Sequence, residues 1–176
     1  MEKYRELLKI ARKALESELN GKKLIVDEGV KKKYATKQAC FVTLSIDDEL
    51  RGCIGSLSAH QELWKDVIDN AVNAGFNDTR FNPISREELK RIKIEISVLS
   101  SSEKLGIGKD VYDKIDNKMG IILKKGWNSA TFLPQVWEQI PDKKEFLEHL
   151  SRKAGLLKDY WKDCEISFYR VESVKE

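Results

Sequence analysis

The residues from 92 to 98 constrain the fold more than any other stretch of this chain. Ile92, Ile94, Ile96 and Val98 alternate there with polar or charged side chains. Because successive side chains of a strand point to opposite faces, this alternation predicts a strand with one buried face. The rest of the chain therefore has to supply partner strands and a layer that covers that face.

Other patterns in the sequence predict both. Runs of β-forming residues separated by turn signals predict two hairpins, over residues 39–54 and 119–133, and a final strand over residues 164–171. Apolar residues at helical spacing predict helices over residues 2–19, 61–74, 85–91 and 142–154. Ser85 and Glu88 have the spacing of a capping box, which marks the start of the third helix.

Length and composition indicate a soluble globular chain. With 176 residues, 41% of them hydrophobic and 35% charged, the chain is long enough to bury a real core, and we expect one domain over residues 1–176 or two lobes that share a core. A net charge of only +3, spread along the chain, argues against a nucleic-acid partner. The charged N-terminus and the lack of a long apolar run predict a cytoplasmic protein with no membrane partner.

The cysteines and histidines suggest neither a disulfide framework nor a metal site. Cys40 and Cys164 alternate with apolar residues and are expected in the core. His60 and His149 have no spacing that suggests a metal ligand set or a dyad, so surface or capping roles are expected. No phosphate-binding glycine loop occurs, and we predict no metal and no cofactor.

The stretch Leu50–Gly55 gathers the most unusual residues of the chain in a predicted strand. Strand parity places Leu50 and Ile54 on one face, where we expect them to meet the core. Arg51 and Cys53 then share the other face, and the fixed positive charge of the arginine favours the thiolate over the thiol. This pattern makes Cys53 a candidate nucleophile and Arg51 a candidate contact for an anion.

A structural interpretation of the same stretch remains open. Gly52 and Gly55 have no Cβ, so either a ligand or a neighbouring backbone could approach the strand closely. A buried cysteine is often a small apolar filler, and an arginine on a strand is often paired with a carboxylate across the sheet. The sequence does not decide between the two interpretations.

The loop Asp78–Pro83 is a second candidate, because it combines an acid, a base, an aromatic residue and a proline. In structural terms, Asp78 could pair with Arg80 and cap a turn while Phe81 fills the core. In functional terms, Arg80 could bind a carboxylate or a phosphate.

Several of these stretches together resemble one known family. Leu50–Gly55, preceded by Phe41–Leu44, is similar to the signature of the AMMECR domain family, whose bacterial and archaeal members are called AmmeMemoRadiSam system protein A. The stretches Asp78–Pro83, Phe132–Val136 and Lys153–Leu156 agree with the family in the same order. Departures occur at Met119, where many relatives have a polar residue, and at Ser151, where a cysteine is common.

The resemblance implies an α+β fold with a largely antiparallel sheet flanked by helices, and a larger and a smaller lobe in one compact unit. It also implies Memo-like and radical S-adenosylmethionine proteins as partners in a shared pathway or complex. The family motif maps without a change onto Leu50–Gly55, which contains the nucleophile candidate Cys53. The expected ligand contacts are Arg51, Gly52 and Gly55 in this motif and Asp78 and Arg80 in the loop that follows. Structural support is expected from Leu50, Ile54, Phe81, Pro83, Pro134 and Gln135.

Two functions fit these observations. The first is an enzyme-like domain that binds a small anionic molecule near Arg51, Cys53 and Arg80, with Cys53 as the nucleophile. The alternative is a non-catalytic adaptor, in which the motif stabilises the sheet and another surface binds partner proteins.

Overall fold

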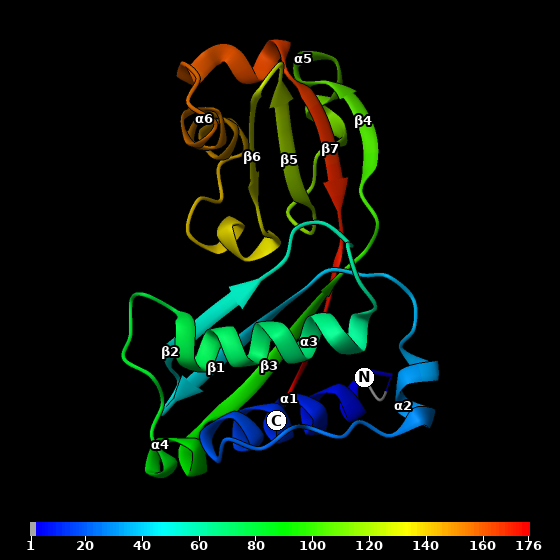
Figure 1. Ribbon diagram of the computed structural model, residues 1–176. Coiled ribbons are helices and arrows are strands. Elements are labelled where there is room, and N and C mark those ends of the chain that lie inside the picture. Colours follow the sequence, from blue (N-terminus) through cyan, green and yellow to red (C-terminus); the bar gives the residue numbers. More distant parts are fainter. Residues whose placement is uncertain (1–2) are drawn as a thin grey trace. The chain divides into compact units, whose positions relative to one another are not determined.

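A computed structural model describes residues 3–176 and divides them into two units (Figure 1). Unit 1 comprises the chain up to Leu99 together with Glu172–Glu176, and unit 2 comprises Ser100–Val171. Each unit has a four-stranded sheet with antiparallel pairs and its own buried hydrophobic cluster. The predicted α+β fold class, with largely antiparallel sheets and flanking helices, is confirmed.

Unit 1 contains four strands in the order β2-β1-β3-β8. Its elements along the chain are α1 (Arg5–Leu19), α2 (Glu28–Lys33), β1 (Cys40–Ile46), β2 (Glu49–Gly55), α3 (Leu63–Val72), the π-helix η1 (Asn73–Asn77), α4 (Arg86–Arg91), β3 (Lys93–Leu99) and β8 (Val171–Lys175). The first predicted helix was expected to start at residue 2, which lies outside the described residues. The predicted single helix over 61–74 is in fact α3 followed by the π-helical turn.

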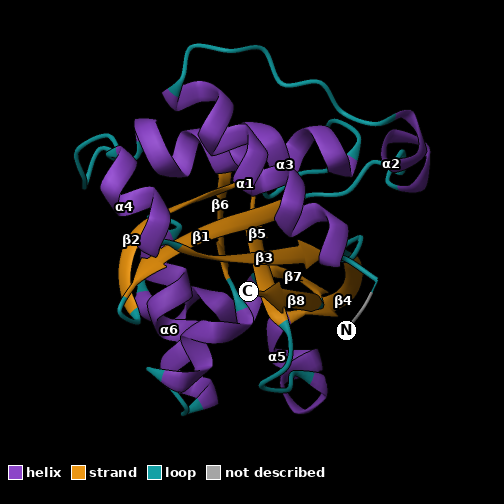
Figure 2. Cartoon of the chain, turned by 90° about the horizontal axis from the view of Figure 1, so that it is seen from below, coloured by secondary structure: helices purple, strands orange, loops and turns teal. Residues whose placement is uncertain are grey.

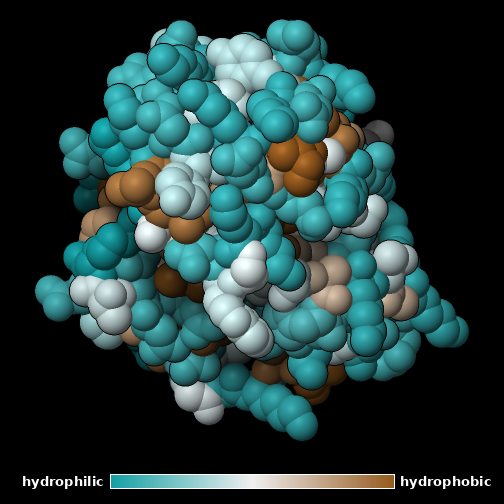
Figure 3. All heavy atoms as spheres, turned by 90° about the horizontal axis from the view of Figure 1, so that it is seen from above, coloured by the Kyte–Doolittle hydropathy of each residue, from teal (hydrophilic) through white to brown (hydrophobic). Residues whose placement is uncertain are grey.

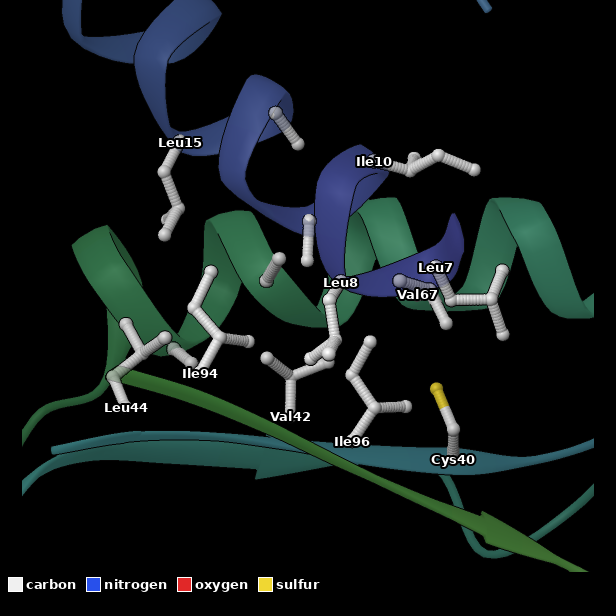
Figure 4. Close-up of a cluster of buried hydrophobic side chains, with 14 of the residues drawn as sticks. Leu7, Leu8, Ile10, Leu15, Cys40, Val42, Leu44, Val67, Ile94 and Ile96 are labelled. Carbon is white, nitrogen blue, oxygen red and sulfur yellow. The ribbon is translucent and has the colours of Figure 1, made fainter. Parts of the chain in front are cut away.

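Helices α1, α3 and α4 lie on one side of the unit 1 sheet (Figure 2). The alternating apolar residues of β1 and β3 face α1 and α3, so that Val42 and Ile96 meet Leu8 and Val67 in a fully enclosed layer (Figure 4). All four of these side chains are at most 5% exposed. The strand predicted from the alternation at 92–98 is therefore present, with its apolar face buried as expected.

The hairpin of β1 and β2 contains a bulge that changes which residues face the core. Its turn is Asp47–Asp48, and both residues have positive φ, as in the two-residue turns that suit the twist of a hairpin. Leu44 pairs with Gly52, whereas the next residue of β1 pairs with Leu50, so Arg51 is an extra residue in β2.

This bulge overturns one expectation from strand parity. Leu50 was predicted to face the core, but its side chain is 46% exposed because the extra residue reverses the alternation on that side of the bulge. Ile54, beyond the bulge, packs against the core as predicted.

Unit 2 contains four strands in the order β4-β7-β5-β6. Its elements are β4 (Glu103–Ile107), α5 (Gly108–Val111), η2 (Tyr112–Lys114), β5 (Gly120–Lys125), β6 (Asn128–Phe132), η3 (Pro134–Glu138), α6 (Lys143–Lys153), η4 (Lys158–Asp163) and β7 (Glu165–Tyr169). The hairpin predicted over 119–133 is β5 and β6. In the core of this unit, Trp137 stacks on Phe146 with ring centroids 3.7 Å apart.

The surface seen from above is mostly hydrophilic, with scattered hydrophobic residues (Figure 3). In unit 2, Trp127 at the tip of the β5–β6 hairpin is fully exposed, and Leu157 is also exposed. Single exposed apolar residues of this kind are normal on soluble proteins. Among the described residues, none of the helices is both long and apolar enough to cross a membrane.

Candidate functional site

The side chain of Arg51 points from the bulge in β2 toward the start of α4. Its Nε donates to Glu88 Oε1 at 2.7 Å and its Nη2 donates to the carbonyl of Asn82 at 2.9 Å. The other oxygen of Glu88 accepts from the backbone N–H of Ser85, which completes the predicted capping box. The hydrogen bond from Arg51, followed by that from Ser85, lowers the pKa of the Glu88 carboxyl to about 2. Arg51 is therefore paired with a carboxylate, as one sequence interpretation expected, but the carboxylate belongs to a helix and not to the sheet.

Asp78 follows the π-helix and ties the middle of β2 to the next loop. Its buried carboxylate accepts from the backbone N–H of Cys53 at 2.9 Å and from Arg80 Nε and Nη2 at 3.0 and 2.7 Å. Arg80 Nη2 also donates to the carbonyl of Cys53 at 3.2 Å. These hydrogen bonds, that from Arg80 first, hold the pKa of the Asp78 carboxyl well below its usual range. The predicted pairing of Asp78 with Arg80 is thus present, and it fixes the backbone on both sides of Cys53.

Arg51 and Arg80 converge on the ring of Phe81. The Cζ atoms of the two arginines lie 5.6 and 5.5 Å from the ring centroid, within the range of a cation–π contact. The three side chains belong to one open pocket of about 450 Å³. Its lining residues are Arg51, Thr79, Arg80, Phe81, Asn82 and Glu88. In Figure 1, the loop that carries four of them runs from the end of α3 past β2 to α4.

Among the described residues, each guanidinium has one NH₂ group without a hydrogen-bond partner. Arg51 Nη1 is buried and lacks a hydrogen-bond partner, which leaves a polar atom without compensation for its lost water. In the described part of the chain, no hydrogen bond uses Arg80 Nη1 either. Arg51 Nη1 is enclosed by protein, whereas the side chain of Arg80 is 55% exposed and could donate to a ligand that accepts hydrogen bonds.

Cys53 lies near this pocket but does not line it. It pairs with Thr43 of β1, and its Sγ is 3.2 Å from Thr43 Oγ1 on the sheet face opposite the core. Cys53 is half-buried, unlike the two other cysteines, which are buried. Because Arg51 bonds to Glu88, its charge is compensated by a carboxylate and is not reserved for the thiol.

The two glycines of the motif are in close contact with other parts of unit 1. A Cβ on Gly52 would lie 2.1 Å from the backbone oxygen of Ala74, and one on Gly55 would lie 2.3 Å from the ring of Phe41. The close neighbour expected from the sequence is thus a backbone at Gly52 and an aromatic ring at Gly55.

The remaining residues expected to support the site lie at its edge or in unit 2. Phe81 is half-buried, whereas Pro83 is exposed. Pro134 opens the short helix η3 in unit 2, and the next residue, Gln135, is exposed there.

The sequence interpretation missed a buried polar network centred on Asp66 in α3. Its carboxylate is 1% exposed and accepts hydrogen bonds from the backbone N–H and Sγ of Cys40, from Ser56 Oγ and from Asn70 Nδ2. Burial, together with the nearby carboxylate, raises the pKa of the Cys40 thiol, so this cysteine stays protonated. The sequence signal that could have revealed this network is the position of Asp66 and Asn70, two polar residues on the apolar face of the helix predicted over residues 61–74.

The two remaining cysteines are in the core, and His60 is at the surface. Cys40 and Cys164 are fully buried, as predicted. The ring of His60 is mostly exposed and lies 3.9 Å from Asp66. Among the described residues, no group of three histidine, cysteine or carboxylate side chains could hold a metal ion.

Comparisons with known proteins place the whole chain in one family. The AMMECR1 family model matches residues 8–175. Protein NEQ441 of Nanoarchaeum equitans is 39% identical over 171 residues, which cover 94% of this chain and 95% of the relative. Protein MK0488 of Methanopyrus kandleri is 38% identical, with 97% and 86% of the two chains covered. A crystal structure of the uncharacterized protein PH0010 from Pyrococcus horikoshii matches with a TM-score of 0.86 and 31% identity, over 99% of this chain and 92% of that one. The chain belongs to the AMMECR1 family.

Proposed function

We propose that unit 1 binds a small anionic ligand in the pocket between Arg51 and Arg80. The observation that carries the proposal is that two arginines, Arg51 and Arg80, line one open pocket together with the ring of Phe81. A carboxylate behind each arginine already holds its side chain in place, so little side-chain entropy remains to be lost on binding. A pocket of about 450 Å³ is in the size range of small-molecule sites.

The test is a titration of the amide resonances of the protein with small anions. Amides from Thr79 to Asn82 should shift and saturate, and the shifts should be lost in Arg80→Gln. Arg91→Gln is the matched control, because Arg91 is also an exposed arginine of unit 1 paired with one carboxylate. If none of the anions tested moves these amides, the proposed binding function is wrong.

Within this proposal, Cys53 is the candidate nucleophile of an enzyme-like domain. The support is its half-buried thiol and the hydrogen bonds of its backbone to Asp78 and Arg80, which connect it to the pocket. Alkylation by iodoacetamide should modify Cys53 faster than Cys40 and Cys164, because both of the latter are buried and burial raises the pKa of both thiols. Equal alkylation rates for all three thiols in the folded protein would contradict the proposal that Cys53 is a nucleophile.

The adaptor remains a second candidate because one observation favours it. The close packing of Gly52 on Ala74 and of Gly55 on Phe41 gives the motif a structural role that needs no chemistry. On this view, Cys53→Ser lowers stability and leaves partner binding intact. The proposed partners, Memo-like and radical S-adenosylmethionine proteins, rest on the family resemblance alone, and co-purification of tagged wild-type and Cys53→Ser chains with each of them would test both points.

A further inference from the structure

The charges around the pocket restrict the kind of anion that it can take, an inference that rests on the proposed function. Arg51 and Arg80 contribute two positive charges, and Glu88 and Asp78 contribute two negative charges through ion pairs of 2.7 Å each. The pKa values of both carboxyl groups are lowered, so the carboxylates stay ionised at neutral pH. The four groups therefore sum to no net charge.

A neutral group of charges does not favour a dianion over a monoanion. The oxygens of a doubly charged phosphate could accept hydrogen bonds from the guanidinium groups. In that position, however, the phosphate would be repelled by the carboxylate of Glu88, which also lines the pocket. It would still lose its own hydration on entry. A monocarboxylate carries a single charge, and in the described part of the chain the exposed side chain of Arg80 has an NH₂ group, Nη1, that is left to donate to it.

Glu88 adds a second requirement. Its oxygens accept one hydrogen bond each, from Arg51 Nε and from the backbone N–H of Ser85, and a carboxylate has about four acceptor positions. Acceptor capacity is thus left on a charged group that lines the pocket. A ligand with a hydroxyl or amino group next to its carboxylate would use this capacity, whereas a plain carboxylate would not.

We infer that the pocket selects a small monocarboxylate with an adjacent hydrogen-bond donor, the chemistry of α-hydroxy and α-amino acids, over phosphate. Phe81 also lines the pocket and is half-buried, so it offers an apolar surface for the carbon skeleton of such a ligand. Phosphate binding is the competing outcome.

The experiment titrates the full chain at pH 7.5 and constant ionic strength with three probes, which are L-lactate, propionate and inorganic phosphate, and follows the amides of Thr79 to Asn82. We expect the tightest binding for lactate. Propionate should bind about 10-fold more weakly, the worth of one hydrogen bond to a charged group. Phosphate should bind at least about 10-fold more weakly than lactate, because its second charge meets Glu88 without a compensating cation.

Two variants keep the interpretation specific. Glu88→Gln should reduce the preference for lactate over propionate, whereas Glu87→Gln, a neighbouring exposed residue of the same helix, should leave it unchanged. The amide spectrum of each variant reports whether it is folded.

The possible failures are distinguishable. If phosphate binds more tightly than lactate, or if lactate and propionate bind equally, the ligand class is wrong while anion binding in the pocket stands. If none of the three probes shifts these amides, the proposed function fails and the inference fails with it.

Discussion

Replacing Glu88 by glutamine should destabilise unit 1 by about 2 kcal/mol. The side chain of Arg51 is only 14% exposed, and its Nε lies 2.7 Å from Glu88 Oε1. The substitution therefore removes a partly buried hydrogen bond between two charged groups. Such bonds contribute about 1.5 to 3 kcal/mol, and the 33% exposure of Glu88 argues for the lower half of that range. Glutamine keeps one oxygen for the backbone N–H of Ser85, so the helix cap is largely retained.

Urea denaturation at pH 7 measures this difference, with a midpoint expected to fall by about 1 M. The matched control is Glu87→Gln, because Glu87 is on the same helix and 80% exposed. Its ion pair with Lys90 is a surface pair and should contribute no more than about 0.5 kcal/mol. If the two variants are equally stable, the reasoning about the pair of Arg51 and Glu88 is refuted.

The same pair predicts the direction of a pH dependence. The pKa of Glu88 is lowered from 4.5 to about 2 in the folded chain, so its stabilising effect is fully present above pH 4.5. Protonation removes that effect as the pH falls from 4.5 toward 2. The stability difference between wild type and Glu88→Gln should therefore be constant from pH 7 to pH 5 and shrink below pH 4.5. A difference that grows on acidification would contradict the assigned ion pair.

Three further variants test other parts of the structure by the same denaturation measurement. Gly52→Ala should cost about 3 kcal/mol or more, because its Cβ would lie 2.1 Å from the backbone oxygen of Ala74, and a cost below about 1 kcal/mol would mean that this contact is looser than described. Asp66→Asn should cost about 2 to 4 kcal/mol, because an NH₂ group would replace one of two buried oxygens that both accept hydrogen bonds, and a neutral result would contradict the network that includes Cys40. Trp127→Ala should change stability by less than about 0.5 kcal/mol because the ring is fully exposed, and a larger loss would show an unrecognised contact.

The elements with strong periodicity could be predicted from the sequence because burial depends directly on that periodicity. The strand around Ile94 and the hairpin of β1 and β2 are examples. The bulge at Arg51 could not be predicted in this way, since it depends on the register with the partner strand and not on the local residues. The error at Leu50 follows from this single extra residue. The π-helical turn after α3 was missed for a similar reason, because it places the oxygen of Ala74 against Gly52 and so depends on the tertiary contact between them.

The candidate site was predicted in part. Residue types alone singled out Arg51 and Arg80, and the structure brings them to one pocket. Glu88 was assigned only to a capping box, which accounts for one of its two oxygens, whereas the other oxygen binds Arg51. Sequence spacing reports local partners such as Ser85 and gives no information about a partner 37 positions away.

The bulge also separates two roles that the sequence interpretation had joined. In a regular strand, Arg51 and Cys53 would share one face, and the charge of the arginine would act on the thiol. The extra residue lets Arg51 reach α4 and the pocket, while Cys53 remains opposite Thr43 on the sheet. Because Glu88 compensates the arginine, a change at Arg51 acts first on the pocket and only indirectly on the sulfur. The proposed ligand binding at the pocket and the proposed reactivity of Cys53 can therefore be tested separately at Arg51 and Cys53, although the backbone of Cys53 is still hydrogen-bonded to Asp78 and Arg80.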